Sequence, residues 1–448
     1  MLALLAASVL GSAHFAATGP PECRKKVLEG VLLLHSFMYE DAREAFQAAA
    51  KSAPCPIAYW GEAMTYDHPI WNEQDGDKGR AALAKIPAGA KVSPMEQGLI
   101  EAARALYGNG REAWMERLSL LHAQLPGDDE VSLFYALSLY ASSNGGRDVK
   151  RAMQAAAIAM DVFERNPDHP GAAHYLIHAC DSPDHAILAL KAARKYAQIA
   201  PGASHALHMP SHIFVQLGMW KDAADSNAAA FAASKQPKDW HSFSWLAAAN
   251  IQLGHPERVL PMLGAEGLPQ STRAVLVVAF VEETRAWGRI DELLGADDTP
   301  AAIRLRLDAA GVRGDEGEAV RLAASLEAAT TKMHGESPKL AAAARVAQAK
   351  SLRDTGSIAA AIDAMRKLAD AEDASVSGPA FFTPAREELG DLFLRSHRFV
   401  EAEREFRAAL LVRPNRLNAL RGLAEAARGA DDPRTADDAQ ARLAAQVR

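Results

Sequence analysis

A pair of histidines recurs in this chain at an interval that matches the length of a two-helix repeat. His174 and His178 return as His208 and His212, so both members of the pair move by 34 residues. A shift of that length is typical of arrays in which each repeat is a helix–turn–helix unit. Because residues four apart lie on one face of a helix, each pair should present both imidazoles on the same side. Two such pairs on neighbouring helices predict one shared polar centre.

The composition of the 448 residues favours an all-helical chain. Alanine dominates the apolar residues, and it is the strongest helix former. Alternating runs rich in valine and isoleucine are nearly absent, which predicts no sheet beyond a stray bridge. The net charge of −7 is spread along the chain without a basic block, which argues against nucleic acid as the main partner.

Three stretches carry the same order of small and large residues. Near the end, small residues stand where two helices would cross closely, large ones fill between them, and a proline ends the second helix: Gly390, Phe393, Phe399, Ala402, Phe406, Ala409 and Pro414. The order returns near the start with Gly30, Tyr39, Ala42, Phe46, Ala49 and Pro54, and in the middle with Gly218, Trp220, Ala223 and Ala230. These spacings resemble the tetratricopeptide repeat family. The resemblance implies an all-α, right-handed α-solenoid of tetratricopeptide-like helix pairs.

Histidine is unevenly distributed, and this divides the chain. Twelve of the 15 histidines lie between His35 and His255. We therefore expect a histidine-rich half at residues 21–264, which carries the site, and a scaffold half at residues 265–448. Residues 1–20 form either an export signal or an N-terminal helix, because the first 17 residues are small and apolar but lack a basic start. No other stretch is long enough to span a bilayer.

The cysteines bear on the cellular compartment. Cys23 opens the first predicted helix and Cys55 follows the second, so an antiparallel helix pair would bring them together. They form either a disulfide, which fits an oxidising compartment, or two small buried residues. We expect a periplasmic or secreted protein, with the cytoplasm as the alternative.

The tetratricopeptide resemblance implies that the first helix of each pair lines a concave groove. Histidines fall on such positions at His35, His174, His178, His205, His208 and His212, and His68 follows its own helix closely. Neutral imidazole is the commonest protein ligand for zinc, copper, iron and nickel. We expect these seven histidines to line a metal site, with purely structural histidines as the alternative. Pro210 predicts a kink within this run.

Two acidic residues are candidate catalytic groups. Asp181 lies three residues after His178 on the same helix face, where its carboxylate would bind the metal or orient a histidine. Glu62 is expected to face the groove in the second repeat. Either acid is a candidate general base for a zinc hydrolase. The remaining histidines, including His122 and His169, are individually interpreted as packed or solvated side chains.

A narrower resemblance covers residues 25–225. The segments are residues 35–39, residues 58–71, residues 174–181 and residues 205–214, which are similar to sequence blocks in a group of bacterial tetratricopeptide proteins. This chain departs from the group at Met38, Ile70 and Cys180. The resemblance supports a site at these histidines and implies no particular reaction.

The ligand types favour one class of chemistry. A histidine-rich, carboxylate-poor site in an exported protein favours copper, with zinc or iron as alternatives. We therefore expect a metal-dependent oxidoreductase, an oxidase or oxygenase, which acts on a small molecule or peptide in the groove. The alternatives are a non-catalytic scaffold for a peptide or protein partner, a metal carrier, and a zinc hydrolase. The sequence predicts no oligomeric state.

Overall fold

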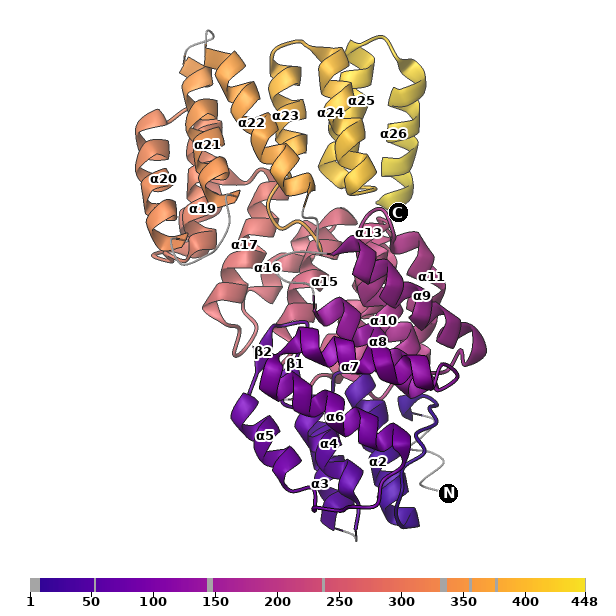
Figure 1. Ribbon diagram of the computed structural model, residues 1–448. Coiled ribbons are helices and arrows are strands. Elements are labelled where there is room, and N and C mark those ends of the chain that lie inside the picture. Colours follow the sequence, from indigo (N-terminus) through magenta and orange to yellow (C-terminus); the bar gives the residue numbers. More distant parts are fainter. Residues whose placement is uncertain are drawn as a thin grey trace. The chain divides into compact units, whose positions relative to one another are not determined.

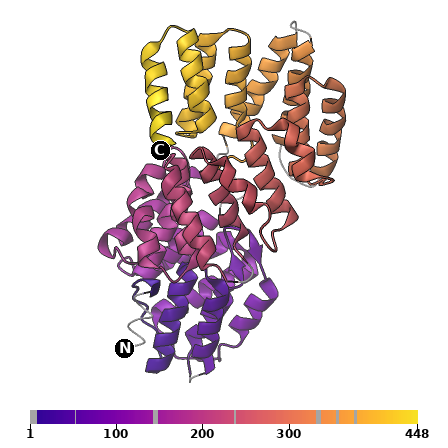
Figure 2. The same ribbon diagram turned by 180° about the vertical axis from the view of Figure 1, so that it is seen from behind.

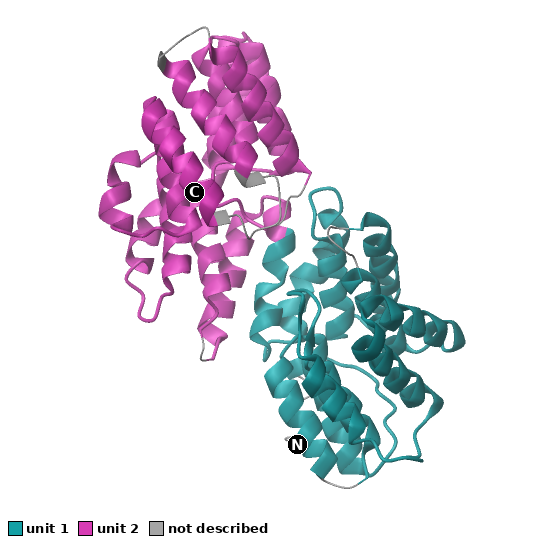
Figure 3. Cartoon of the chain, turned by 60° about the vertical axis from the view of Figure 1, so that its left-hand side comes forward, with its two compact units in different colours: residues 1–213 teal, residues 214–448 magenta. Residues whose placement is uncertain are grey.

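The computed structural model describes residues 9–51, 54–142, 148–235, 238–330, 337–353, 357–374 and 378–447. Almost all regular structure in these ranges is helical (Figure 1). The chain divides into two compact units, Met1–Ile213 and Phe214–Arg448 (Figure 3). This division follows the packing of the helices, whereas the expected boundary at residue 264 follows the distribution of histidine. No described helix is long and apolar enough to cross a membrane.

Unit 1 consists of helices joined by short connections and one small hairpin. Its helices are α2 (Pro21–His35), α3 (Tyr39–Lys51), α4 (Pro56–Met64), α5 (Gly76–Ala84), α6 (Pro94–Asn109), α7 (Arg111–Gln124), α8 (Asp129–Ala141), α9 (Val149–Arg165), α10 (Pro170–Cys180), α11 (Ala186–Ile199), α12 (Ser204–His208) and α13 (Pro210–Gln216), the last of which crosses the unit boundary. The hairpin pairs β1 (Asp67–His68) with β2 (Glu73–Gln74) in antiparallel register. Among the described residues this is the whole of the sheet structure, so the expectation of an all-helical fold is confirmed.

Unit 2 continues the same architecture. Its elements are α14 (Trp220–Ala233), α15 (Trp240–Gln252), η1 (Pro256–Arg258), α16 (Val259–Met262), α17 (Gln270–Thr284), η2 (Trp287–Arg289), α18 (Ile290–Leu294), α19 (Pro300–Arg313), α20 (Glu316–Thr330), α21 (Ser337–Arg353), α22 (Ile358–Asp373), α23 (Ala385–Arg395), α24 (Phe399–Val412), α25 (Leu417–Gly429) and α26 (Pro433–Gln446). The orange and yellow helices from α19 to α26 stand side by side, and each packs against the next (Figure 2).

The same glycine–phenylalanine contact occurs at both ends of the chain. Phe46 lies against Gly30 and Gly61, where an added Cβ would come within 2.7 and 2.2 Å of its ring. Phe406 lies against Gly390 and Gly422 in the same way, at 2.7 and 2.3 Å. Each phenylalanine thus fills the space between two first helices whose glycines permit the close approach. The fold is therefore a tetratricopeptide-like helical repeat, as the repeat frame predicted.

The first helices of unit 1 do not only contact their sequence neighbours. α2 packs against α4, α4 against α6 and α8 against α10, and α10 in turn packs against α2. The end of α2 therefore lies beside α10, although His35 and His174 are separated by 139 residues. This contact places the first repeat next to the repeated histidine pairs.

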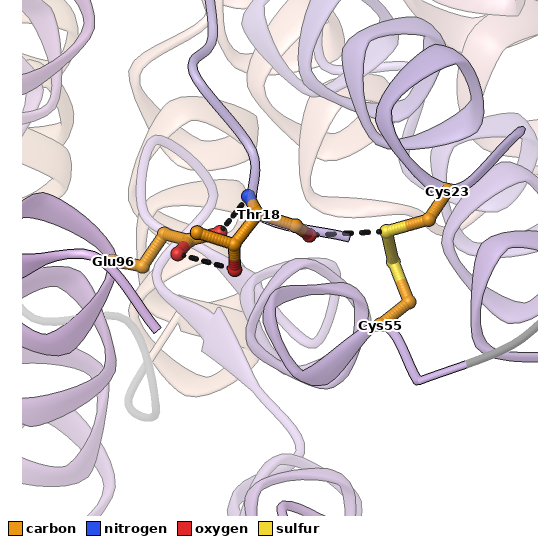
Figure 4. Close-up of a disulfide and its surroundings, with 4 residues drawn as sticks. All are labelled: Thr18, Cys23, Cys55 and Glu96. Carbon is orange, nitrogen blue, oxygen red and sulfur yellow. Dashed lines mark hydrogen bonds between the residues drawn. A yellow bond between two sulfur atoms is a disulfide. The ribbon is translucent and has the colours of Figure 1, made fainter. Parts of the chain in front are cut away.

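The chain before α2 packs against unit 1 in its described part. Both the backbone amide and the hydroxyl of Thr18 donate to the Glu96 carboxylate, each at 2.8 Å (Figure 4). Glu96 is buried and also accepts the Ser93 amide in a capping box at the start of α6. Phe15 is buried and stacks on Trp60. Residues 1–8, which belong to the expected export signal, lie outside the described residues.

A disulfide joins Cys23 at the start of α2 to Cys55 just before α4 (Figure 4). Their Cα atoms are 5.8 Å apart. The expectation that these residues meet where the first helix pair opens and closes is confirmed. The Thr18 carbonyl oxygen lies 3.4 Å from the Cys23 sulfur, so the segment before α2 is held at the same place.

The first helices of unit 2 carry buried ion pairs. The Arg345 guanidinium on α21 contacts Asp308 on α19 and Glu388 on α23. Arg416 contacts Glu283 at 2.8 Å and also contacts Glu387. Unit 2 is thus held together by buried charge pairs as well as by apolar packing. The composition of this half, rich in alanine and arginine, does not predict these ion pairs.

Candidate metal centre

Two helical segments position the repeated histidines. All eleven residues of α10 are buried, including His174 and His178. The second segment is interrupted as expected, because α12 ends at His208 and α13 begins at Pro210. Proline has no backbone N–H to donate to a helical hydrogen bond, which accounts for the break within the histidine run. His205 and His208 therefore lie before the break and His212 after it.

Three histidines form a compact group. One ring nitrogen from each of His174, His178 and His205 lies within 4.8 Å of the others. The Nε2 atoms of His174 and His205 are 3.2 Å apart. The Nε2 atom of His178 is buried and has no hydrogen-bond partner. A buried nitrogen without a partner is uncommon in proteins, and a bound ion is one of its ordinary explanations.

The ring of His174 is oriented by a hydrogen bond from its far side. Its Nδ1–H donates to the backbone carbonyl of His35 at 2.6 Å. That bond leaves the lone pair on Nε2, which faces His205, as in metal-bound histidines whose other nitrogen is hydrogen-bonded. The contact depends on the packing of α2 against α10.

Burial keeps these imidazoles neutral. It lowers the pKa of His174 to about 3, and burial followed by the neighbouring histidines lowers the pKa of His178 and of His205 well below the usual value. A neutral imidazole offers a lone pair, and metal ligation requires that form. The group therefore has the protonation state of a ligand set at neutral pH.

A second histidine pair lies beside the first group. The Nε2 atoms of His208 and His212 are 3.1 Å apart, and the His212 Nδ1 atom is 2.7 Å from an Asp181 carboxylate oxygen. The ring of His212 lies 6.1 Å from that of His178, and the ring of His208 lies 6.2 Å from that of His205. The five predicted residues on α10, α12 and α13 are thus brought together. Asp181 contacts a histidine, which is the orienting position rather than a direct ligand position.

His35 does not join this cluster, contrary to expectation. Its Nε2 atom is 2.7 Å from Glu130, and its Nδ1 atom is 2.9 Å from the Tyr175 hydroxyl. His169 contacts the other Glu130 oxygen at 3.1 Å through Nε2, while its Nδ1 accepts the Gly171 amide at the start of α10. All four ring nitrogens are thus occupied by hydrogen bonds. His35, Glu130 and His169 form a buried structural triad that joins α2, α8 and α10.

Glycine at position 171 permits that triad. A Cβ atom there would lie 2.5 Å from the Nδ1 atom of His35, too close for any real contact. Burial raises the pKa of Glu130, but the neighbouring imidazoles outweigh this effect and lower it to about 2. Burial lowers the pKa of His35. The triad is therefore a carboxylate that accepts hydrogen bonds from two imidazoles.

His68 and Glu62 also lie apart from the histidine cluster. His68 stacks on Tyr39 with ring centroids 4.1 Å apart, and its nitrogens face the Thr65 carbonyl and Glu73. Glu62 is buried and ion-paired to Lys85 at 2.9 Å. The expected roles of His68 as a ligand and of Glu62 as a base are not supported by these contacts, because the partners occupy both side chains.

Aromatic side chains surround the cluster. Phe37 has a φ of 52°, the left-handed conformation common at helix ends, and its ring lies 4.3 Å from that of His174. Trp71, on the turn between β1 and β2, lies 5.8 Å from His205 and is 50% exposed. Tyr140 on α8 lies 5.8 Å from His178. Sequence reasoning assigned none of these a role at the site.

Glu130 was also missed, and one signal pointed to it. It is an acidic residue at the start of a long apolar helix, α8, where an unpartnered carboxylate would be costly. An acid in such a place indicates a buried partner. The identity of that partner depends on the contact between α2 and α10, which sequence periodicity does not predict.

The chain is thus a tetratricopeptide-like repeat protein with a histidine cluster. No protein-family model matches the sequence, and no curated protein matches it. Solved structures with a similar arrangement include a human IFIT1 dimer with PPP-AAAA, at 13% identity and a TM-score of 0.40, covering 99% of each chain. The APC/C hetero-tetramer Cut9-Hcn1 aligns at 13% identity and 0.37, over 90% of this chain and 76% of that one. Yeast Tom70 aligns at 11% and 0.29, over 92% and 96%. The fold assignment rests on the helix pairs, and no function is taken from these structures.

Proposed function

We propose that this protein is a metal-dependent oxidoreductase with copper at His174, His178 and His205. The observation that carries the proposal is the buried Nε2 atom of His178, which has no hydrogen-bond partner and lies among two other neutral imidazoles. Three imidazoles and no carboxylate form a donor set that suits copper or zinc far better than magnesium or calcium. Copper held by histidines commonly supplies oxygen activation, which favours an oxidase or oxygenase.

The surroundings support a small substrate beside the ligands. Trp71 presents a half-exposed indole close to His205, and planar rings stack favourably on such a surface. The narrower resemblance to bacterial proteins with the same histidine blocks supports the location and leaves the reaction open. The zinc hydrolase alternative loses one of its two candidate bases, Glu62, which is ion-paired to Lys85.

The Cys23–Cys55 disulfide favours a periplasmic or secreted location. The small residues Gly11, Ser12 and Ala13 are a candidate cleavage site, and removal of a signal after Ala13 would retain the contacts of Phe15 with Trp60 and of Thr18 with Glu96. It would remove the contacts of residues 9–12, where the Val9 carbonyl accepts the Gly202 amide at 3.0 Å and the Ser12 amide donates to the Asp168 carbonyl at 2.9 Å.

Metal analysis tests the proposal most directly. The protein is purified without chelators, offered copper, zinc and iron in turn, desalted and measured by elemental mass spectrometry. We expect at least one copper ion per chain, the loss of one ion in His178→Ala and in the less buried His205→Ala, and unchanged content in His397→Asn, which follows α23. Asparagine suits that position because His397 has a φ of 53°.

Oxygen uptake by the copper-loaded protein with phenols and other planar substrates then tests turnover. Copper-dependent uptake that is lost in His178→Ala supports an oxidase or oxygenase. A metal-loaded protein without uptake would favour a metal carrier. A wild type that holds no metal after this treatment would overturn the proposal and favour a scaffold that binds a peptide or protein.

A further inference from the structure

The histidine cluster contains five imidazoles, two more than the three protein ligands of a reactive four-coordinate site. His174, His178, His205, His208 and His212 are linked by ring-to-ring distances of 4.7 to 6.4 Å. A four-coordinate ion in a reactive site takes three protein ligands and keeps one position open. If His174, His178 and His205 serve one ion, then His208 and His212 remain beside it.

The remaining pair has the spacing of two ligands on one ion. Nitrogens about 2.0–2.1 Å from a tetrahedral ion are about 3.3 Å apart. The Nε2 atoms of His208 and His212 are 3.1 Å apart, close to the 3.2 Å between the Nε2 atoms of His174 and His205. The pair His174 and His205 and the pair His208 and His212 therefore each have two ring nitrogens at the separation that two ligands of one ion require.

Each pair also contains one ring that is oriented from behind. The His174 Nδ1–H donates to the His35 carbonyl, and the His212 Nδ1–H donates to the Asp181 carboxylate. In both rings the lone pair is then on Nε2, which faces the other member of its pair. A carboxylate that holds the far nitrogen of a histidine is the usual support of a metal ligand and raises its basicity.

We propose that His208 and His212 hold a second metal ion next to the first, with Asp181 as the positioning residue of His212. The inference rests on the proposed function, because it takes the first ion at His174, His178 and His205 as given. The second ion belongs to the same class of late transition metals that imidazole prefers, copper or zinc. Solvent or substrate completes its coordination. The rings of the two groups are close enough for both ions to face one substrate.

The number of ions per chain tests this inference. Full-length protein is stripped of metal, titrated with copper or zinc, desalted and measured by elemental mass spectrometry against amino-acid analysis. We expect two ions per chain in the wild type and one in His212→Ala and His208→Ala. His397→Asn should retain two, because His397 follows α23 and is not one of the five histidines of the cluster.

Asp181→Asn keeps the shape of the side chain and is therefore the variant expected to disturb folding least. This substitution should lower the affinity for the second ion about 10- to 100-fold, while the first ion is retained at full occupancy. A wild type with one ion, unchanged in His212→Ala and Asp181→Asn, would overturn the second site and leave the first standing. The two Nε2 atoms would then share a proton. A wild type with no ion would overturn both.

Discussion

Replacement of Glu130 distinguishes a structural triad from a metal site. Both of its carboxylate oxygens accept imidazole N–H groups, from His35 at 2.7 Å and from His169 at 3.1 Å. The carboxylate is fully buried, so no water replaces a lost partner. A hydrogen bond to a charged group contributes about 1.5–3 kcal/mol to stability. Two such bonds predict that Glu130→Ala lowers the free energy of unfolding by about 3–6 kcal/mol.

Glu130→Gln separates charge from shape. The amide can still bond both rings if His35 changes its tautomer, so only the charge assistance is lost, and we expect about 2 kcal/mol of destabilisation at pH 7. The pH dependence should change as well. Because the folded pKa of Glu130 is about 2, its ionised form contributes stability above the unfolded value near 4.5 that is lost as pH falls towards 2. Glu130→Gln should flatten the stability profile across this window.

The assay is urea unfolding followed by circular dichroism, with metal content measured on the same preparation. Glu112→Ala is the control, because its ion pair with Arg151 is 45% exposed on the glutamate side and should contribute under about 1 kcal/mol. We expect both Glu130 variants to be destabilised and to retain metal if they fold. Loss of metal from Glu130→Gln at unchanged stability would refute the structural reading. A Glu130→Ala variant as stable as Glu112→Ala would refute the hydrogen-bond reasoning.

Three further outcomes follow from contacts elsewhere in the chain. Burial and the charges of Asp308 and Glu388 raise the pKa of Glu282 to about 8, so wild-type stability should fall between pH 4.5 and 8, and Glu282→Gln should be more stable by a few kcal/mol at pH 9 yet equal at pH 4, as urea unfolding would measure. The Cys23–Cys55 bridge spans 32 residues, so the double serine variant should lose about 3–4 kcal/mol, and wild type in reductant should match it in a melting experiment. Gly61→Ala and Gly422→Ala place a methyl group into Phe46 and Phe406 and should each cost about 1–3 kcal/mol, whereas Gly108→Ala, which meets nothing within 4 Å, should be neutral or stabilising.

The parts of the fold that depend on local periodicity were predictable from sequence. The repeat frame predicted the helix pairs and the close contact of glycine with Phe46 and Phe406. The ends of the first helix pair predicted that Cys23 and Cys55 meet. These features need only the geometry of one helix and its neighbour. The spacing of four residues within each histidine pair and the break at Pro210 belong to the same category.

The parts that depend on distant contacts were not predictable in this way. Because α2 packs against α10, which in turn packs against α8, His35 meets Tyr175 and Glu130 instead of the other predicted ligands. Its groove position was therefore a poor guide to its role. The hairpin that carries His68 also directs that ring towards Tyr39 and Glu73. A position in the repeat frame fixes the face of a helix, but the opposite surface decides which partner a side chain meets.

The histidines of the first repeat and those of the later repeats are linked by backbone rather than by side chains. His35 gives its ring to Glu130 and its carbonyl to His174, so one residue serves both the triad and the orientation of a candidate ligand. The contact to His174 uses only the backbone of His35, so loss of the Glu130 bond to the ring is compatible with retained metal. The His35 carbonyl, and not the triad, sets the tautomer of His174 and with it the nitrogen that faces His205. We therefore interpret His35 and His169 as structural residues and the histidines of α10, α12 and α13 as candidate ligands, and the His35 carbonyl connects the two groups.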